Sequence, residues 1–240
     1  MGPTDAVPAP GGRRIDSFAA VLWDLDGTLV DTEPCWTVAE LALAEKYGGS
    51  WSAEQALDVV GFDLLDAARL MRERMGVDPS PEQIVEELLD SVIEQVKHTV
   101  PWRDGSLELL TSLRESGVPC ALVTMSWTRL VEPILTCLPQ GTFEAVVTGD
   151  TVDRGKPHPE PYLTAARLLD VLASECLAVE DSDTGATSAV AAGCTVLCAP
   201  LHVPVPPGPG RVFTGSLEGL DASTVLAGSL EQGSAPNRAL

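Results

Sequence analysis

The order of apolar and polar residues changes character near residue 100 of this chain. Ala19–Trp23 is a short apolar run bounded like a buried strand, and from residue 32 to Val100 apolar residues recur at helical spacing without strand-like alternation. Beyond Pro101, short apolar runs alternate with helical segments, which is typical of a parallel sheet whose strands are joined by helices. The pattern therefore predicts an α/β core with an all-helical segment inserted after its first strand.

The same pattern sets the bounds of the expected elements. Strands are expected at Ala19–Asp24, Val118–Thr124, Phe143–Thr148, Cys176–Asp181, Cys194–Ala199 and Arg211–Thr214. Helices are expected at Glu33–Tyr47, Ser52–Val60, Asp63–Met75, Ser80–Val96, Gly105–Ser116, Ser126–Leu138, Pro159–Leu169, Thr184–Ala192 and Ala222–Ala227. Ser52 and Ser80 are suited to cap the helices that they begin, and Pro81 stands at a first helical position. Pro133 would kink its helix unless that helix begins later than Ser126.

These elements divide the chain into a core and a cap. Residues 18–31 and 101–227 are expected to form the core domain, a Rossmann-like parallel sheet with helices, and residues 32–100 an inserted all-helical cap domain. Residues 1–17 contain prolines and glycines without periodicity and are expected to be a flexible leader. Residues 228–240 are expected to be a flexible tail.

Composition and charge narrow the classes of partner. Hydrophobic residues make up 45% and charged residues 21% of the 240, so a substantial core is possible. The chain has 15 Lys and Arg against 35 Asp and Glu, a net charge of −20 that repels nucleic acid and anionic membranes, so we expect neither as a partner. A phosphorylated substrate would be repelled too, so any anion site must be neutralised locally by a metal, a lysine or helix N-termini.

The apolar runs of the chain do not predict a membrane span or a secretion signal. None approaches the roughly 20 residues of a membrane span, and the polar first residues lack the apolar middle of a signal peptide. The 6 cysteines are scattered in apolar contexts without a CxxC pair, which favours small buried residues in a reduced compartment. We therefore expect a cytoplasmic protein, and a monomer.

The first candidate site is the sequence DLDGT at the end of the first strand. Asp24 and Asp26 fall at the carboxyl end of a strand, where open α/β sheets bind ligands, and Gly27 allows the tight turn that follows. Two close carboxylates suggest a nucleophile, Asp24, and a neighbouring acid/base, Asp26, with a hard divalent cation that offsets their repulsion. The ordinary alternative is a strand ending in an Asx turn, where Asp and Gly are common.

Two later loops carry groups suited to a phosphate. Thr124 ends a predicted strand and Ser126 begins a helix, so hydroxyls and free N–H groups could cradle an anion there. Taken alone, a strand end and a helix cap explain these two residues as well. Lys156, in a GKP sequence, lies on a loop stiffened by prolines that would aim its ammonium with little loss of entropy, although it could also be a surface lysine.

The sequence LAVEDSDTG offers a second pair of acids at a strand end. Glu180 and Asp181 follow an apolar strand and stand next to a helix start that contains Gly185. Such acids suit a magnesium ion that is kept partly hydrated. A solvated turn is the alternative, but a second strand that delivers carboxylates beside the first favours a metal.

In their order and spacing these motifs resemble the four motifs of the haloacid dehalogenase-like (HAD) hydrolases. The resemblance covers residues 19–227, and the helical insert is similar to the small cap of the subgroup that contains β-phosphoglucomutase and sugar-phosphate phosphatases. It implies that Asp24 attacks phosphorus to form an aspartyl phosphate, and that Asp26 protonates the leaving oxygen and then activates water. Thr124, Ser126 and Lys156 would bind the phosphoryl group.

The resemblance also implies a cofactor and a substrate class. Asp24, Asp26 through its backbone carbonyl, and Asp181 would bind Mg²⁺, and Glu180 would act on the ion directly or through water. The partner would be a small phosphorylated metabolite, with a sugar phosphate as the leading candidate. The acid at position 26 favours phosphoryl transfer over the cleavage of carbon–halogen bonds.

Three functions compete within this resemblance. Mutases of the subgroup carry a His soon after the first motif and a basic residue after a cap glycine, where this chain has Trp36 and Phe62. A phosphatase is therefore favoured over a β-phosphoglucomutase-like mutase. The third function is that of a non-catalytic phosphometabolite-binding protein of the same fold, against which the intact acids and lysine speak. Trp36 and Phe62 could line the inner face of the cap or be ordinary core residues.

Overall fold

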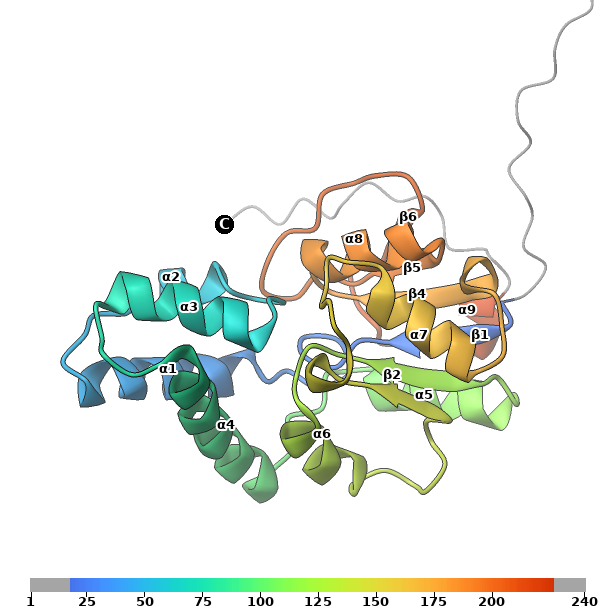
Figure 1. Cartoon of the computed structure of the whole chain (residues 1–240). Coiled ribbons are helices and arrows are strands. Elements are labelled where there is room, and N and C mark those ends of the chain that lie inside the picture. Colours follow the sequence, from blue (N-terminus) through green and yellow to red (C-terminus); the bar gives the residue numbers. More distant parts are fainter. Residues whose placement is uncertain (1–17, 227–240) are drawn as a thin grey trace, which may run out of the picture.

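A computed structural model of the chain describes residues 18–226, so the leader expected over 1–17 and the tail expected over 228–240 lie outside the described residues. Six strands form one parallel sheet in the order β3-β2-β1-β4-β5-β6 (Figure 1). Their bounds are β1 Ala20–Trp23, β2 Cys120–Val123, β3 Ala145–Val147, β4 Cys176–Glu180, β5 Thr195–Cys198 and β6 Arg211–Phe213. Every predicted strand is present and somewhat shorter than predicted, because the flanking residues leave the ladder as the chain turns.

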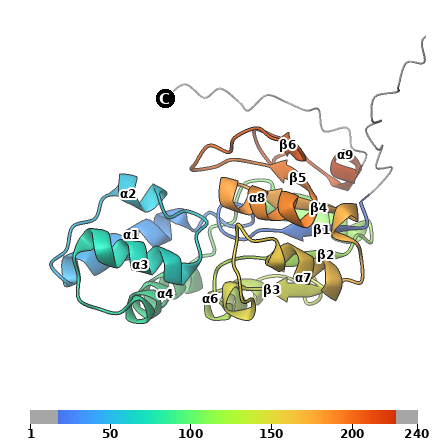
Figure 2. The same cartoon turned by 45° about the horizontal axis from the view of Figure 1, so that its top comes forward.

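Successive residues of the central strand β1 are buried on opposite faces of the sheet. Val21 and Trp23 of β1 join the apolar cluster under α5, α6 and α9, whereas Ala20 and Leu22 join the cluster under α7 and α8. Figure 2 shows α7 and α8 side by side in front of the sheet. These helices are α5 Ser106–Glu115, α6 Thr128–Leu135, α7 Glu160–Leu168, α8 Asp183–Ala192 and α9 Ala222–Leu226. Because both faces are covered, the strands appear in the sequence as continuous apolar runs.

All the predicted helices are present, and they differ from the prediction at several ends and in two added short turns. α6 begins at Thr128, two residues later than predicted, because the Ser126 hydroxyl donates to Asp26 rather than capping the helix. The short 3₁₀ turns Gly149–Thr151 and Ala173–Glu175 are not predicted, since three residues are too few to show a period. Over the part of the chain that the structure describes, no helix combines the length and the apolarity needed to cross a lipid bilayer.

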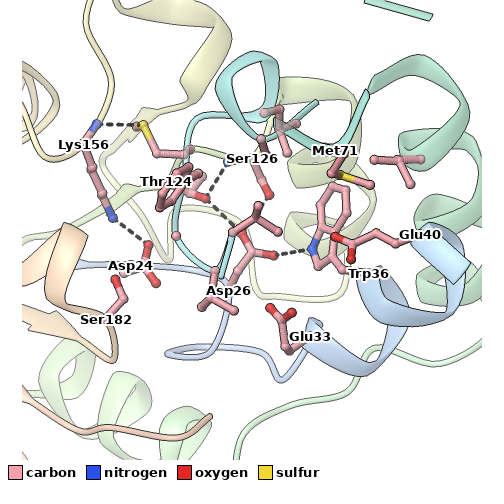
Figure 3. A pocket seen from close by; sticks show the side chains of 18 residues that line it. Asp24, Asp26, Glu33, Trp36, Glu40, Met71, Thr124, Ser126, Lys156 and Ser182 are labelled. Carbon is pink, nitrogen blue, oxygen red and sulfur yellow. Dashed lines mark hydrogen bonds and ion pairs between the residues drawn. The ribbon is translucent and has the colours of Figure 1, made fainter. Parts of the chain in front are cut away.

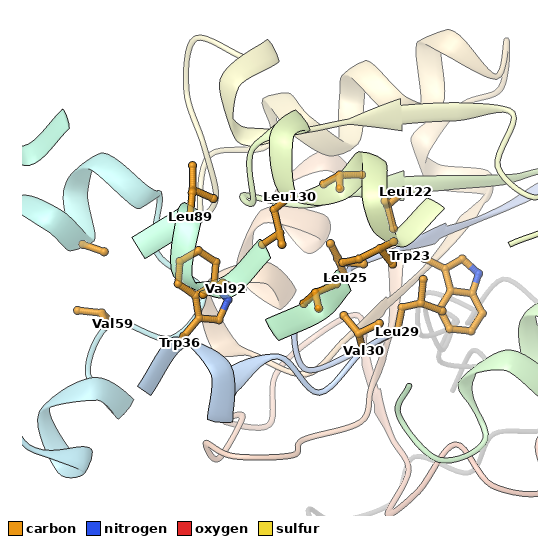
Figure 4. Packing of buried hydrophobic residues seen from close by; sticks show 14 of the residues in the cluster. Trp23, Leu25, Leu29, Val30, Trp36, Val59, Leu89, Val92, Leu122 and Leu130 are labelled. Atoms are coloured by element: carbon orange, nitrogen blue, oxygen red, sulfur yellow. The ribbon is translucent and has the colours of Figure 1, made fainter. Parts of the chain in front are cut away.

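The insertion between β1 and β2 contains α1 to α5, and its first four helices form a cap beyond the carboxyl ends of the strands (Figure 1). They are α1 Glu33–Lys46, α2 Ala53–Leu57, α3 Leu64–Met75 and α4 Pro81–His98. Ser52 and Ser80 form capping boxes at the starts of α2 and α4, as predicted. α4 packs between α1, α3 and α6, and its Leu89 and Val92 lie in the apolar cluster that continues into the core (Figure 4).

Two chain segments that lie side by side join the cap to the core. Val30 and Trp102 form an antiparallel bridge, and the Asp31 N–H donates to the Pro101 carbonyl at 2.7 Å. These four residues are the points where the chain leaves the core and returns to it. The cap is therefore attached by one paired strap rather than by two separate linkers.

The cap also contacts the core directly. Arg129 of α6 forms ion pairs with Glu86 and Asp90 of α4. In the loop between α2 and α3, Gly61 lies so close to the start of α8 that a Cβ on it would stand 3.0 Å from Ser182 Oγ. The cap is therefore closed over the strand ends.

Candidate active site

The candidate site lies where the carboxyl ends of β1, β2 and β4 meet. β1 is flanked by β2 and β4, so the residues that follow these three strands are neighbours. Asp24 follows β1, Thr124 follows β2, and Glu180 ends β4 with Asp181 directly after it. Together with Lys156 from the loop before α7, all of them are buried. The fold thus brings residues from all four predicted motifs to one edge of the sheet.

Lys156 is the buried cation of this group. Only 3% of its side chain is exposed, and its ammonium donates to Asp24 Oδ1 at 2.6 Å, to Glu180 Oε1 at 2.7 Å and to the Val123 carbonyl at 2.9 Å. Burial alone would lower the pKa of Lys156, but the charges and hydrogen bonds of Asp24 and Glu180 outweigh it and raise that pKa above its usual value. The lysine therefore stays charged and fixed against Asp24 (Figure 3).

Asp24, Glu180 and Asp181 form a cluster of three buried carboxylates. Each offers an oxygen that lies within 4.8 Å of the others. Burial raises the pKa of Asp24 to about 7, with Glu180 adding to the rise and Lys156 opposing it. Burial, followed by the charges of Asp24 and Glu180, also raises the pKa of Asp181 well above its usual range. Three acids beside one ammonium leave an excess of negative charge that a divalent cation would offset.

One oxygen atom tests whether a cation fits this cluster. Asp181 Oδ2 is buried and has no hydrogen-bond partner among the described residues. An unpartnered buried carboxylate oxygen costs free energy, and coordination to a hard cation would remove that cost. The donors are all oxygen atoms, which is the ligand type that Mg²⁺ takes. The residues present therefore fit a magnesium ion.

Gly27 and Arg103 hold the loop that carries Asp24 against Asp181. Gly27 has a φ of +81°, and a Cβ on it would stand 2.1 Å from Asp181 Oδ2, so both conformation and space require glycine. The buried Arg103 donates to the Gly27 carbonyl at 2.5 Å. Burial lowers the pKa of Arg103, and the charge of Asp181 opposes that shift. Arg103 thus acts as a second positive charge behind the acidic cluster.

Asp26 is held by four donors. Its Oδ1 accepts from the Thr32 hydroxyl at 2.5 Å and from Trp36 Nε1 at 3.4 Å. Its Oδ2 accepts from the hydroxyls of Thr124 at 3.1 Å and Ser126 at 2.7 Å, and Figure 3 shows Asp26 among Trp36, Thr124 and Ser126. The two hydroxyls that were expected to bind phosphate therefore donate their hydrogen bonds to the Asp26 carboxylate in this structure. The Asp26 carboxylate is not part of the cluster of acids that could hold the metal, so any contribution to the ion rests with its backbone carbonyl.

Tyr162 of α7 is a residue of the site that the sequence does not single out. Its hydroxyl donates to Glu180 Oε1, the same oxygen that accepts from Lys156, and the Lys156 ammonium lies 5.2 Å from the centre of its ring. Glu180 is packed against Gly185, where a Cβ would stand 2.1 Å from its carboxylate. Glu180 Oε1 is therefore fixed toward Lys156 and Tyr162, so that Glu180 is both a member of the cluster of three acids and a partner of the lysine.

A cavity lies between these residues and the cap (Figure 3). Its core wall includes Asp24, Asp26, Thr124, Ser126 and Lys156. Trp36 and Phe62 both line its cap wall, where Trp36 is 7% and Phe62 38% exposed, and apolar neighbours there are Val59, Val60, Leu64, Met71 and Leu88. The volume is about 70 Å³, whereas small-molecule sites usually measure roughly 300–1,000 Å³. A substrate larger than a few atoms can therefore enter only after the cap has moved.

Comparisons with known proteins agree with this geometry. The family model described as "Haloacid dehalogenase-like hydrolase" matches residues 21–199. Hexitol phosphatase B of Escherichia coli is 31% identical over 176 residues, which cover 72% of this chain and 79% of that protein. A phosphoglycolate phosphatase of Salmonella typhimurium is 33% identical over 205 residues, which cover 75% of this chain and 81% of that protein.

Among solved structures, a mutant of CbbY from Rhodobacter sphaeroides in complex with xylulose-1,5-bisphosphate shares this arrangement of elements. The TM-score is 0.75 at 23% sequence identity, and the match covers 85% of this chain and 96% of that chain. At this identity the likeness shows a common fold.

Proposed function

Since this chain belongs to the haloacid dehalogenase-like hydrolases, we propose that it is a Mg²⁺-dependent phosphatase that hydrolyses a small phosphate monoester, such as a sugar phosphate, through an aspartyl-phosphate intermediate. The enzyme class is a hydrolase of phosphoric monoesters, and the similar curated proteins include phosphatases of hexitol phosphate and phosphoglycolate. The observation that carries the proposal is the ammonium of Lys156 at 2.6 Å from Asp24, beside an acidic cluster with an unpartnered oxygen.

In the proposed reaction, Asp24 is the nucleophile. Lys156 holds one oxygen of its carboxylate, which leaves Oδ2 without a hydrogen-bond partner among the described residues and free to attack phosphorus. The covalent step divides one difficult displacement into two easier ones. The lysine also compensates negative charge on the phosphoryl oxygens, which is the main requirement of phosphoryl transfer.

Asp26 is the proposed acid and base. Its carboxylate lines the cavity and is oriented by donors from the core and from α1, so it can protonate the leaving oxygen and later take a proton from water. A phosphate in the cavity would compete with Asp26 for the hydroxyls of Thr124 and Ser126. These two residues are therefore the proposed switch between holding Asp26 and holding substrate.

Asp24, Asp181 and the backbone carbonyl of Asp26 are the proposed ligands of the magnesium ion. When bound, the ion would supply positive charge to the phosphoryl group and offset the repulsion among the buried acids. Arg103, behind Gly27, stabilises the loop and the charge of Asp181 from the other side. We also propose that residues 18–31 and 101–227 form one domain and residues 32–100 another, which the paired strap at Val30 and Trp102 supports.

The proposal is tested with p-nitrophenyl phosphate, with and without Mg²⁺. We expect turnover by the wild type only with the metal, and a loss of about 10³-fold or more in Asp24→Asn, because the nucleophile is gone. Asp170→Asn is the matched control, since Asp170 is exposed and its positive φ of 57° suits asparagine, so it should behave as wild type. Turnover that persists in Asp24→Asn, or that ignores chelation of the metal, would overturn the mechanism.

A further inference from the structure

The wall that the cap gives to the cavity carries acids. Glu33, Trp36 and Glu40 are spaced three and four residues apart on α1, so they share one face of the helix, and this face lines the cavity. In Figure 3 the carboxylates of Glu33 and Glu40 point toward the same space as Asp26 and the ring of Trp36. A substrate held by the core would therefore present its alcohol part to two glutamates and one indole ring.

Both glutamates retain acceptor capacity. Glu40 is only 4% exposed and uses Oε2 to accept from Trp51 Nε1 at 2.7 Å, and no described residue donates to the Glu33 carboxylate. Burial, and after it the charge of Glu40, raises the pKa of Glu33 to about 8, and burial raises the pKa of Glu40 to about 7. The Glu33 shift includes repulsion by nearby acids, whereas the Glu40 shift comes from burial and is opposed by the hydrogen bond of Trp51.

The basic side chains of the described cap residues lie away from the cavity. Lys46, Arg69, Arg72, Arg74 and Lys97 are all exposed. Arg69 and Arg74 are paired with acids of the cap surface, Asp66 and Asp58. Among the described residues that line the cavity, Lys156 is the one cation, and it is already bound to Asp24 and Glu180. The cap wall thus has no partner for a second anionic group.

We propose that Glu33 and Glu40 select substrates whose alcohol part is neutral and rich in hydroxyls, and exclude phosphate esters that carry a second phosphate or a carboxylate. This inference rests on the proposed function, whose substrate class it defines. Hydroxyls donate well to carboxylate oxygens, and the Trp36 ring offers an apolar face to the carbon chain. Above about pH 8, where both acids are ionised, a second anion would instead face two negative charges in a closed cavity, where repulsion is stronger than in water.

The test is made at pH 9, where both glutamates are ionised because their raised pKa values are about 8 and about 7. It compares kcat/KM for a hexitol 6-phosphate with kcat/KM for 2-phosphoglycolate and for a hexose 1,6-bisphosphate. We expect the wild type to prefer the hexitol phosphate by about 100-fold or more, since like charges in the cavity disfavour the other two. In the double variant Glu33→Gln, Glu40→Gln this ratio should narrow by about 10-fold, because the side chains keep their shape and lose their charge. Glu45→Gln, on the exposed side of the same helix, is the matched control and should keep the wild-type ratio.

p-Nitrophenyl phosphate separates the two proposals, because its leaving group has neither hydroxyls for the glutamates nor a second anionic group. Because Glu33 and Glu40 line the same cavity as Asp26, the folding of the double variant is checked by its Tm, and each ratio is taken between two esters of the same variant. Wild-type turnover of p-nitrophenyl phosphate with equal rates on the hexitol phosphate and 2-phosphoglycolate would overturn the selection by Glu33 and Glu40 alone. An unchanged ratio in the double variant would do the same, whereas a wild type inactive on every ester would overturn the proposed function as well.

Discussion

The two walls of the cavity differ in how their charges are compensated. On the core wall, Lys156 lies within hydrogen-bond distance of Asp24, and four donors surround Asp26. On the cap wall, Glu33 and Glu40 face the same space with only the Trp51 indole as a donor among the described residues. A wall whose charges are compensated by donors and cations can hold its reacting groups in one geometry. A wall whose acids lack such partners can distinguish substrates by their charge. The comparison teaches that, in the proposed function, reaction and selection are assigned to different segments of the chain.

The largest effect is expected from a substitution in the acidic cluster of the core wall, which changes how its charges are compensated. In Asp181→Asn, we expect activity on p-nitrophenyl phosphate to fall by about 100-fold or more, because a proposed ligand of the metal is removed. Mg²⁺ should raise the Tm of the wild type by about 5 °C at 100 times its Kd, and this rise should disappear in the variant. The Tm values of the wild type and of the variant are measured by thermal unfolding with and without Mg²⁺. Without the ion the variant should be at least as stable as the wild type, because one of three buried acids is gone.

Asp183→Asn controls for this substitution, since the side chain of Asp183 is 54% exposed and pairs with Arg211 outside the cluster. If Asp181→Asn keeps a full magnesium-dependent rise in Tm, the ion is bound by other residues. The contrast between the two walls would then need a different explanation.

A smaller effect is expected when the support of Lys156 is weakened. Tyr162→Phe removes the hydroxyl that donates to Glu180 and keeps the ring beside the lysine. We expect kcat to fall by about 10-fold with KM little changed, because Lys156 and Glu180 are less well oriented, and stability to fall by about 1–2 kcal/mol. Tyr47→Phe is the control. Tyr47 is the only other tyrosine of the sequence, and it is exposed and donates a hydrogen bond to Glu87. A lower Tm with an unchanged kcat would show that Tyr162 is only structural.

The last expected effect concerns the cap wall, and it is a change in stability rather than in activity. The pKa of Glu40 is raised by burial from 4.5 to about 7, so between these values the folded protein binds a proton that the unfolded chain has released. Glu40 therefore makes the free energy of unfolding fall as pH rises from 4.5 to 7, with the full loss above pH 7. Glu40→Gln, which still accepts from Trp51, should be more stable than the wild type by about 2 kcal/mol at pH 8 and close to it at pH 5.

Urea denaturation at the two pH values measures this difference, with Glu45→Gln as the exposed control on the same helix. A difference between Glu40→Gln and the wild type that is the same at pH 5 and pH 8 would contradict a buried, uncompensated acid. The claim that an ionised Glu40 in the cap wall destabilises the fold would then be wrong.

Much of the core could be predicted because its signals are local. Strand and helix periods are visible in short windows, and the carboxyl ends of parallel strands share an edge, so Asp24 and Asp181 could be placed together in advance. The loop residue Lys156 could be placed with them only by the resemblance to the family. The strand-end hydroxyls of Thr124 and Ser126 were less predictable. Their positions were expected, but Asp26 is an acceptor of the same chemistry as a phosphate, and the local sequence does not decide between the two.

Residues that act over long distances in the sequence could not be predicted. Arg103 reaches Gly27 across 76 positions, and nothing in its own segment indicates that partner. Tyr162 fits the apolar face of a helix, so its hydroxyl gives no separate signal. Glu33 and Glu40 have the spacing of an ordinary polar helix face, and only the packing of the α2–α3 loop over that face turns it into the wall of a cavity.

The bridge between Val30 and Trp102 brings both ends of the cap to a single point at the rim of the core. A segment that enters and leaves at adjacent positions can be exchanged as a cassette, because the recipient needs only one docking point for it. A helical module from another protein whose own ends lie equally close could be grafted between residues 31 and 101 without shifting the register of any strand. The substrate preference would then be that of the grafted module, while phosphoryl transfer would still be carried out by the residues of the recipient core.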